Sequence, residues 1–259
     1  MIQRLSCRPD RRSRARARGR RASRILFAVA AMAALLSVDA PAALAVPPLG
    51  VTGTAPADVT AGRVGALFAG GQGGGHFCTA SVVRSQDRDV IATAAHCLGS
   101  LDTTYFAPGY RDGEAPYGLW KLTDMYVAPG WTDSEDPDED IAFATVAPMD
   151  GRQIEDAVGG FAVTAEQPAD ATVSIVGYPS SEDSPLHCAN GTTLLSDTQR
   201  RIECPDLSGG SSGSPWLVDG ALAGVLGGYE GGGTVPEVSY SAVMGDQAVE
   251  LYREASDNG

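Results

Sequence analysis

Three separated stretches of this chain hold side chains that could carry out nucleophilic catalysis. His96 stands in "ATAAHC", Asp140 opens the apolar run "DIAFATV", and the glycine-rich stretch "GGSSGSPW" spans residues 209–216. A serine hydroxyl is a weak nucleophile and needs a base to take its proton. The base in turn needs a third group that fixes its tautomer and stabilises its positive charge. His96, Asp140 and one serine of this stretch would complete such a set, whereas the competing interpretation gives His96 a structural role.

The stretch "GGSSGSPW" is framed by apolar residues, with Leu207 before it and Trp216 at its end. This frame favours a tight turn within the fold over a loose linker. Acyl transfer needs two backbone N–H groups aimed at the oxygen that becomes negatively charged, and glycine allows the chain to turn such groups inward. One turn could therefore supply both the nucleophile and the donors.

The first 45 residues are typical of an export signal. An arginine-rich run is followed by the 14-residue apolar run "ILFAVAAMAALLSV" and by Ala43-Leu44-Ala45, a small-x-small cleavage site. The apolar run is short for the alternative, a transmembrane anchor. We expect a secreted, extracellular protein that has no membrane association after signal removal. The arginine pairs leave the export route open.

Without that signal the chain is strongly acidic. Residues 1–45 hold 10 of the 19 Lys and Arg and 2 of the 32 Asp and Glu, so the remaining 9 basic and 30 acidic residues give a net charge of −21. Such a surface argues against nucleic-acid binding, which needs a basic face.

The remaining cysteines are Cys78, Cys97, Cys188 and Cys204. An even number in an exported protein indicates two disulfides. Three pairings are possible, and sequence proximity favours Cys78–Cys97 and Cys188–Cys204. No Cys-x-x-Cys pair is present, so we expect no zinc site, and we expect no other metal or cofactor.

The elements that would position these residues are short strands. Alternating or β-branched runs, cut by Gly, Pro, Asp and Ser, cover residues 64–68, 77–83, 89–95, 118–128, 140–146, 171–178, 192–196, 214–218, 221–229 and 234–240. Many short strands without a βαβ rhythm predict a sandwich or barrel. We expect residues 46–62 to form a flexible lead-in or short propeptide. Residues 241–255 predict a helix, N-capped by Ser241, that packs on the second half of the chain.

The motifs "TAAHC", "DIAF" and "GSSGSP", in this order, resemble the chymotrypsin-like (trypsin-fold) serine proteases over essentially all of residues 64–255. The resemblance implies an all-β fold of two antiparallel six-stranded β-barrels with a C-terminal α-helix. It also implies the site residues, which are the triad His96, Asp140 and Ser212 and the N–H groups of Gly210 and Ser212 as oxyanion hole. The family's histidine-loop disulfide matches Cys78 and Cys97.

According to this resemblance, residues 63–150 form the N-terminal barrel with His96 and Asp140. Residues 151–240 form the C-terminal barrel with Ser212, and residues 241–259 are the helix and tail. The implied function is a secreted serine endopeptidase that acts, as a monomer, on a protein or peptide substrate through an acyl-enzyme. One alternative is a non-catalytic binding module on the same fold. An esterase of the α/β-hydrolase kind is disfavoured, since no Gly-x-Ser-x-Gly lies between a strand and a helix.

Two positions depart from the animal enzymes of this family. Ser211 replaces the aspartate that pairs with a newly cut amino terminus, so we expect that activation switch to be absent. In keeping with this, Val64 is expected to begin the first barrel strand rather than to follow a cleavage after Arg63. Ser214 replaces the second glycine after the nucleophile, and Gly-x-Ser-Gly-Ser-Pro resembles the bacterial glutamyl-endopeptidase branch.

The substrate pocket is less well defined by sequence. An ungapped count places Asp206 where trypsin-like enzymes carry a buried carboxylate, and the equally weighted alternative is a turn residue. Gly227, Gly228 and Tyr229 would lie along the substrate backbone. Leu226 stands near the place of the histidine of Glu-selective relatives, so a glutamyl preference lacks its expected partner.

Other polar residues have simpler interpretations. The acidic loop 133–139 could bind Ca²⁺, but it lacks EF-hand spacing, and a solvated loop is favoured. His76 and His187 are expected to serve in packing and in a loop, respectively.

Overall fold

The structure is a computed structural model that describes residues 48–168 and 171–257. The proposed export signal therefore lies outside the described residues. No helix within the described part of the chain is long and apolar enough to cross a membrane.

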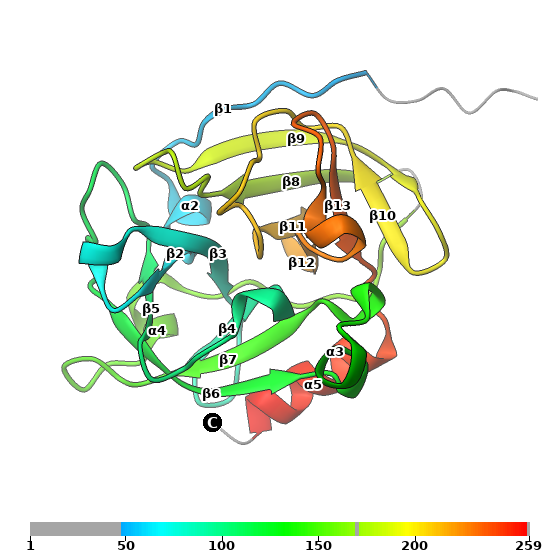
Figure 1. The fold of residues 1–259 in the computed structure, drawn as a ribbon. Helices are drawn as coiled ribbons and strands as arrows, with labels where there is room; N and C mark the ends of the chain where they lie inside the picture. The colour runs from blue at the N-terminus through cyan, green and yellow to red at the C-terminus, as the bar shows by residue number, and fades with distance from the viewer. Residues whose placement is uncertain (1–47, 169–170, 258–259) are drawn as a thin grey trace, which may run out of the picture. The chain divides into compact units, whose positions relative to one another are not determined.

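The first half of the chain forms a closed antiparallel barrel of six strands (Figure 1). The strands, in the order β2-β3-β4-β7-β6-β5, are β2 (Val64–Ala69), β3 (His76–Val82), β4 (Val90–Thr93), β7 (Ala142–Val146), β6 (Trp120–Val127) and β5 (Thr104–Pro108). Aromatic side chains such as Phe68, Phe106 and Phe143 fill the interior and are buried, which is the environment that favours them in strands. Val64 is fully buried and pairs with Ser81, so it begins the first strand as expected.

The second half forms a half-barrel. Its six-strand path is β12-β11-β8-β9-β10-β13, and β1 adds a seventh strand beside β9. These strands are β8 (Thr172–Gly177), β9 (Leu186–Leu194), β10 (Gln199–Ile202), β11 (Pro215–Val218), β12 (Ala221–Val225), β13 (Ser239–Ala242) and β1 (Gly53–Thr54). The end strands do not share a ladder, although just beyond β12 Gly227 N donates to Tyr240 O at 3.0 Å. Trp216, Ile175 and Ile202 lie in its buried core.

Both favoured disulfides are present. Cys78–Cys97 ties β3 to the single turn that carries His96, and Cys188–Cys204 ties β9 to the segment after β10. The first of these bonds therefore anchors the turn that carries His96.

Residues 50–63, within the stretch predicted to be a flexible lead-in or short propeptide, are hydrogen-bonded to the fold. Gly50 N donates to Glu203 O at 2.8 Å, and β1 pairs with the start of β9. The short helix α2 (Val59–Arg63) is N-capped by Asp58, whose carboxylate accepts hydrogen bonds from Thr60 N and Ala61 N. A two-residue strand such as β1 has no periodicity that the sequence could reveal.

The remaining elements are short, except for the C-terminal helix. They are α3 (Pro129–Ser134), α4 (Ile154–Val158), α5 (Asp246–Asp257) and the 3₁₀ turns η1 (Gln72–Gly74), η2 (Ala95–Cys97), η3 (Pro137–Glu139) and η4 (Tyr229–Gly232). The prediction of Ser241 as N-cap was wrong, because Ser241 lies within β13 and the helix begins at Asp246.

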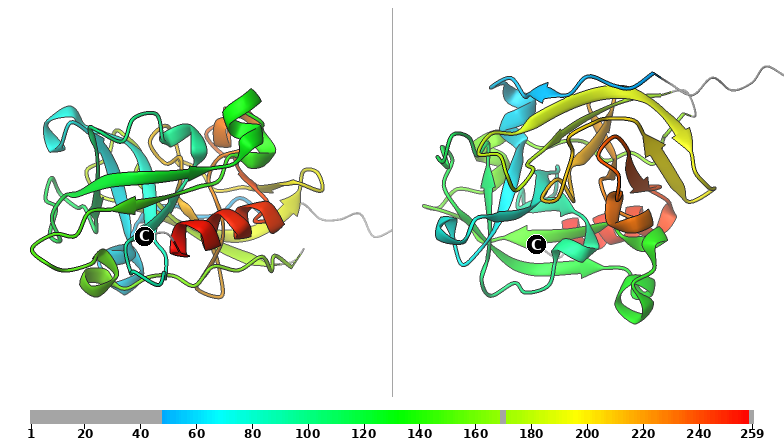
Figure 2. Two further views of the ribbon diagram at one scale, coloured as in Figure 1. Left: turned by 90° about the horizontal axis from the view of Figure 1, so that it is seen from below. Right: turned by 45° about the horizontal axis from the view of Figure 1, so that its top comes forward.

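Helix α5 packs against the first barrel, whereas the sequence predicts packing on the second half of the chain. It lies alongside β6 and β7 of the first barrel (Figure 2), where the rings of Tyr252 and Phe143 are 5.6 Å apart. Tyr252 Oη also donates to Arg84 O at 2.6 Å. The end of the chain thus returns to the half that carries His96.

Candidate active site

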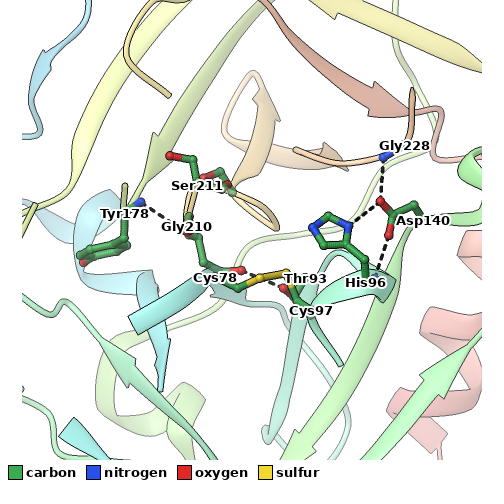
Figure 3. Close-up of a disulfide and its surroundings, with 11 residues drawn as sticks. Cys78, Thr93, His96, Cys97, Asp140, Tyr178, Gly210, Ser211 and Gly228 are labelled. Atoms are coloured by element: carbon green, nitrogen blue, oxygen red, sulfur yellow. Dashed lines mark hydrogen bonds and ion pairs between the residues drawn. A yellow bond between two sulfur atoms is a disulfide. The ribbon is translucent and has the colours of Figure 1, made fainter. Parts of the chain in front are cut away.

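His96 and Asp140 are joined by a direct hydrogen bond (Figure 3). His96 lies in η2 directly after β4, and His96 Nδ1 is 2.7 Å from Asp140 Oδ2. A carboxylate oxygen only accepts, so Nδ1 must carry a proton, and in the neutral imidazole the lone pair of Nε2 is then free. About a quarter of the His96 side chain is exposed, 27%, so Nε2 can reach a bound molecule. This is the tautomer that a general base needs.

Asp140 is held by three hydrogen bonds at the start of β7. Its Oδ1 accepts from His96 N at 2.9 Å, and its Oδ2 accepts from Gly228 N at 2.8 Å in addition to His96 Nδ1. The side chain is only 1% exposed. A buried carboxylate is stable only when hydrogen bonds replace its hydration, and these three do so. The bond from Gly228 also links the half-barrel to the Asp140 carboxylate.

The stretch "GGSSGSPW" forms two consecutive turns. Ser211 N donates to Ser208 O, and Ser214 N donates to Ser211 O, each at 3.0 Å. The third residue of each turn is a glycine with positive φ, Gly210 at 97° and Gly213 at 81°. Glycine at this position with positive φ is typical of type II turns. A side chain at Gly210 or Gly213 would also overlap neighbouring backbone atoms, so both glycines are required.

Gly210 N and Ser212 N, like the N–H of the exposed Gly209, have no acceptor among the described residues. The carbonyl of each of their peptide units is bonded on the opposite side. Gly209 O accepts from Ser180 N at 2.7 Å, and Ser211 O accepts from Ser214 N. In a planar trans peptide the C=O and N–H point in opposite directions. The two free N–H groups are thereby fixed in place and available to an incoming oxygen.

Ser212 lies against the strands that lead to His96. Thr79 N donates to Ser212 O at 2.7 Å, and a Cβ at Gly213 would meet Thr93 and Ala94, just before η2. Ser212 Oγ itself makes no hydrogen bond within the described chain, to His96 Nε2 or to any other group. In free enzymes such a bond is often long and tightens only when a substrate binds.

Comparison with known proteins agrees with this geometry. The family model described as Trypsin matches residues 51–242.

The chain belongs to the trypsin family.

Solved structures of family members have the same fold. The protease Anisep from Arthrobacter nicotinovorans is 25% identical, with a TM-score of 0.69, and the match covers 80% of this chain and 100% of that one. The thermostable serine protease AL20 from an extremophilic microorganism is 27% identical, with a TM-score of 0.68, over 78% of this chain and 100% of that one. A Glu endopeptidase at 18% identity, with a TM-score of 0.65, covers 81% of this chain and 98% of its own, and this likeness concerns the fold alone. No curated protein matches the sequence.

Ser211, which replaces an aspartate of the animal trypsin family, is fully buried. Its Oγ has no hydrogen-bond partner within the described residues. The side chain therefore fills space beside Ser212 as a small neutral group. Trypsin-family chemistry at Ser212 would not depend on a charge at this position.

Asp206 does not have the environment of a buried pocket carboxylate. Its side chain is exposed, and its backbone is left-handed, with a φ of 66°. Asp206 N donates to Pro236 O at 3.0 Å, which places the residue in a surface turn. The structure corrects the pocket interpretation in favour of the turn, because aspartate tolerates positive φ well.

Gly227 and Gly228, which together with Tyr229 are predicted to lie along a substrate backbone, lie beside Asp140. A Cβ at Gly227 would come within 2.7 Å of Asp140 Oδ2, so only glycine fits there. Tyr229 begins the 3₁₀ turn η4, and its N–H donates to Gln199 Oε1 at 3.1 Å. This segment is therefore a turn bonded to the protein itself, and not an open extended strand.

Gln199 is a site residue that the sequence did not reveal. Its amide is 4% exposed, and Nε2 donates at 2.8 Å to both Pro137 O and Asp138 Oδ1 in the loop just before Asp140. Through Tyr229 N it also holds the segment after Gly228. A single glutamine in a polar strand, "QRRI", gave no signal of this role.

The acidic loop before Asp140 uses several carboxylates to hold its own backbone. Asp136 accepts from Asp138 N, and Glu139 Oε2 accepts from Gly130 N at 2.7 Å. Among the described residues, the one group of three possible metal ligands within 4.8 Å of one another is Cys78, His96 and Cys97. Those two cysteines are joined in a disulfide and cannot act as thiolate ligands.

The other two histidines have structural partners. His76 Nε2 lies 3.0 Å from Glu182 O, and the ring makes edge contacts with Phe68, Tyr110 and Tyr178. Burial raises the pKa of Tyr178 well above its ordinary value, so this ring stays neutral; the backbone oxygen of Tyr178 lies beside Gly210. His187 Nε2 lies 3.0 Å from Ser174 Oγ on neighbouring strands.

Proposed function

We propose that the protein is a secreted serine endopeptidase that hydrolyses peptide bonds through an acyl-enzyme on Ser212. Membership of the trypsin family supports serine-protease chemistry. The observation that carries the finer proposal is the bond from His96 Nδ1 to Asp140 Oδ2, because it leaves Nε2 free as a base.

In the proposed reaction Ser212 Oγ attacks the carbonyl carbon of the scissile peptide, and His96 Nε2 takes the hydroxyl proton. The carbonyl oxygen becomes an oxyanion that accepts hydrogen bonds from Gly210 N and Ser212 N. His96 then gives its proton to the leaving amine as the C–N bond breaks, and the acyl group remains on Ser212. Water, deprotonated by His96, releases the acid and restores the serine.

Each of these groups is expected to contribute to the reaction rate. A positioned base contributes about 10²–10⁴-fold to the rate. Each oxyanion donor contributes about 10²–10³-fold, because it is already in place where the charge develops. Asp140 stabilises the imidazolium that forms on His96.

The proposal is tested with protein that begins at Val46 and a diverse peptide library. Ser212→Ala should reduce turnover by about 10⁴–10⁶-fold, because it removes the nucleophile. Ser211→Ala is the matched control, since it removes an oxygen that has no hydrogen bond within the described chain, and it should be mild. Both variants should unfold at the temperature of the wild type.

Two results would contradict the proposal. Equal loss in both variants would mean that Ser212 is not the sole nucleophile. A correctly folded wild type that cleaves no peptide would favour the non-catalytic binding module.

Secretion is tested separately. The amino terminus of protein recovered from the culture medium should be Val46, after the small-x-small site. Because residues 50–63 are hydrogen-bonded into the fold, we expect them to be retained. Protein found only inside cells with residues 1–45 attached would contradict this part.

A further inference from the structure

Ser214 makes an unusual double contact just after the proposed nucleophile. Its Oγ donates to Ser211 O at 2.6 Å, and its backbone N donates to the same oxygen at 3.0 Å. Ser214 is fully buried, so no water competes for either bond. The resembling motif of the animal enzymes has glycine here, which can supply the N–H but not the hydroxyl.

The oxygen that Ser214 holds belongs to the peptide unit that ends in Ser212 N. Because this peptide is planar and trans, fixing the Ser211 carbonyl also fixes the direction of the Ser212 N–H. That N–H has no acceptor among the described residues and is one of the two proposed oxyanion donors. The position of the Ser214 hydroxyl is thereby coupled to the orientation of a catalytic donor.

The space for this hydroxyl is made by Gly177, the last residue of β8. A Cβ at Gly177 would overlap Ser214 Oγ and would lie 3.3 Å from Ser214 Cβ. Gly177 adopts no positive φ, so its lack of a side chain serves this close approach rather than a turn. Ser214 and Gly177 therefore form a matched pair across β11 and β8.

We propose that Ser214 is a positioning residue for the oxyanion hole, and that its hydroxyl, seated over Gly177, holds the Ser211–Ser212 peptide with its N–H facing the developing oxyanion. This inference rests on the proposed function. Preorganised donors accelerate acyl transfer because they need no reorientation when charge develops. A looser peptide would keep the donor but lower its occupancy of the catalytic orientation.

A second serine–glycine pair in the same sheet offers a matched control. Ser241 is 1% exposed, its Oγ donates to Ala242 O at 2.8 Å, and a Cβ at Gly224 would overlap it. Ser241→Ala thus removes an equally buried hydroxyl bonded to a backbone carbonyl. Its carbonyl partner is not part of the turn that carries Ser212.

The test compares Ser214→Ala with Ser241→Ala on one peptide substrate and one peptide aldehyde, which binds as a tetrahedral adduct. Active sites are counted by fluorophosphonate titration, so that misfolded protein does not enter kcat. Ser214→Ala should lower kcat about 10-fold with KM nearly unchanged, below the 10²–10³-fold of deleting a donor outright. It should weaken aldehyde binding by the same factor. Ser241→Ala should change neither kcat nor aldehyde affinity.

A double-mutant cycle with Gly177→Ala tests the pairing itself. Gly177→Ala should lower kcat in the wild type because the new Cβ displaces the Ser214 hydroxyl. It should have little further effect in Ser214→Ala, where that oxygen is gone. Additive losses would contradict the pairing.

The two proposals fail in different ways. An active wild type whose kcat and aldehyde affinity are unaffected by Ser214→Ala overturns the positioning role and leaves the protease proposal intact. A loss confined to KM, or one that Ser241→Ala reproduces, overturns it as well. A wild type that neither titrates nor cleaves overturns both.

Discussion

The two halves of the candidate site treat their polar groups in opposite ways. In the closed barrel, both oxygens of Asp140 accept hydrogen bonds, and His96 Nδ1 is committed to one of them. In the half-barrel, Gly210 N, Ser212 N and Ser212 Oγ have no partner within the described residues. In the proposed reaction the groups of the first set must keep their partners, and those of the second must be free to gain one.

The turns of the half-barrel, which carry these free N–H groups, are nevertheless held in place by hydrogen bonds. Their carbonyls, Gly209 O and Ser211 O, are bonded on the side away from the free N–H groups. Leaving donors unsatisfied disfavours the free protein, and this arrangement prevents the turn from collapsing to satisfy them. The following predictions break or sharpen this comparison, from the largest expected effect to the smallest.

Asp140→Asn should break the saturated half most severely. An amide has one acceptor oxygen where the carboxylate has two, so His96 N, His96 Nδ1 and Gly228 N cannot all keep an acceptor. The wrong histidine tautomer then leaves Nε2 protonated, and kcat should fall by about 10⁴-fold with folding retained. Steady-state kinetics on the best library peptide measures this.

Asp138→Asn is its matched control. Asp138 lies in the same loop, but its Oδ1 accepts from Gln199 Nε2, a bond that an asparagine oxygen can also accept. Turnover should change by less than a few-fold. A comparable loss in the two variants would mean that loop charge, and not the bond to His96, controls activity.

Gln199→Ala should sharpen the comparison, because Gln199 belongs to the half-barrel and bonds to the loop of the closed barrel. Its removal leaves Pro137 O, Asp138 Oδ1 and Tyr229 N without a partner. We expect unfolding to become easier by about 1–3 kcal/mol. The value of kcat/KM should fall several-fold as the Asp140 loop and η4 loosen.

Thermal unfolding and kinetics of Gln199→Ala are compared with those of Thr198→Ala, the neighbouring residue, whose hydroxyl bonds only to Ser196 within the described chain. If the two variants behave alike, Gln199 does not connect the halves. If Gln199→Ala loses stability without any change in kcat/KM, the connection does not reach the site.

The variant Asp89→Asn tests a second buried carboxylate of the barrel, whose hydrogen bonding differs from that of Asp140. Asp89 is 8% exposed, and its Oδ1 has no hydrogen-bond partner. Burial, and to a smaller degree the charge of Asp87, raises the pKa of Asp89. The folded state therefore favours the protonated form, and that stability is lost as pH rises through the raised value.

Asparagine is neutral at every pH, so Asp89→Asn should raise the melting temperature at pH 7 by a few degrees, about 1 kcal/mol for a domain of this size. The advantage should shrink as pH falls through the raised pKa of Asp89 and be absent below the ordinary carboxyl pKa. Melting curves across this pH range measure it, and a variant that is less stable at pH 7 would show that the Asp89 charge has a stabilising partner.

The features that the sequence predicted correctly depend on short motifs. The order of His96, Asp140 and the glycine turn predicted the fold family, and proximity predicted both disulfides. Alternating apolar runs predicted most of the strands. These features are local, so a few neighbouring residue types suffice to recognise them.

The missed features depend on distant parts of the chain. Strand β10, "QRRI", is polar although Gln199 and Arg200 are buried. Their side chains donate hydrogen bonds to loops far away in the sequence, around Pro137 and Gln167 respectively. The side of the molecule on which α5 packs is likewise set by tertiary contacts of Tyr252 and not by its own periodicity. For Asp206 the ungapped count leaves a pocket carboxylate and a turn residue equally weighted, because such a count cannot detect that the chain turns at a positive φ there.

The most direct test of the central claim is to identify the residue that a fluorophosphonate modifies in the wild-type protein. Peptide mapping by mass spectrometry should find a single adduct on Ser212. The rate of labelling should fall steeply in Asp140→Asn, because His96 would no longer act as the base. An adduct on Ser211, Ser208 or Ser214, or labelling that is indifferent to Asp140, would contradict the account.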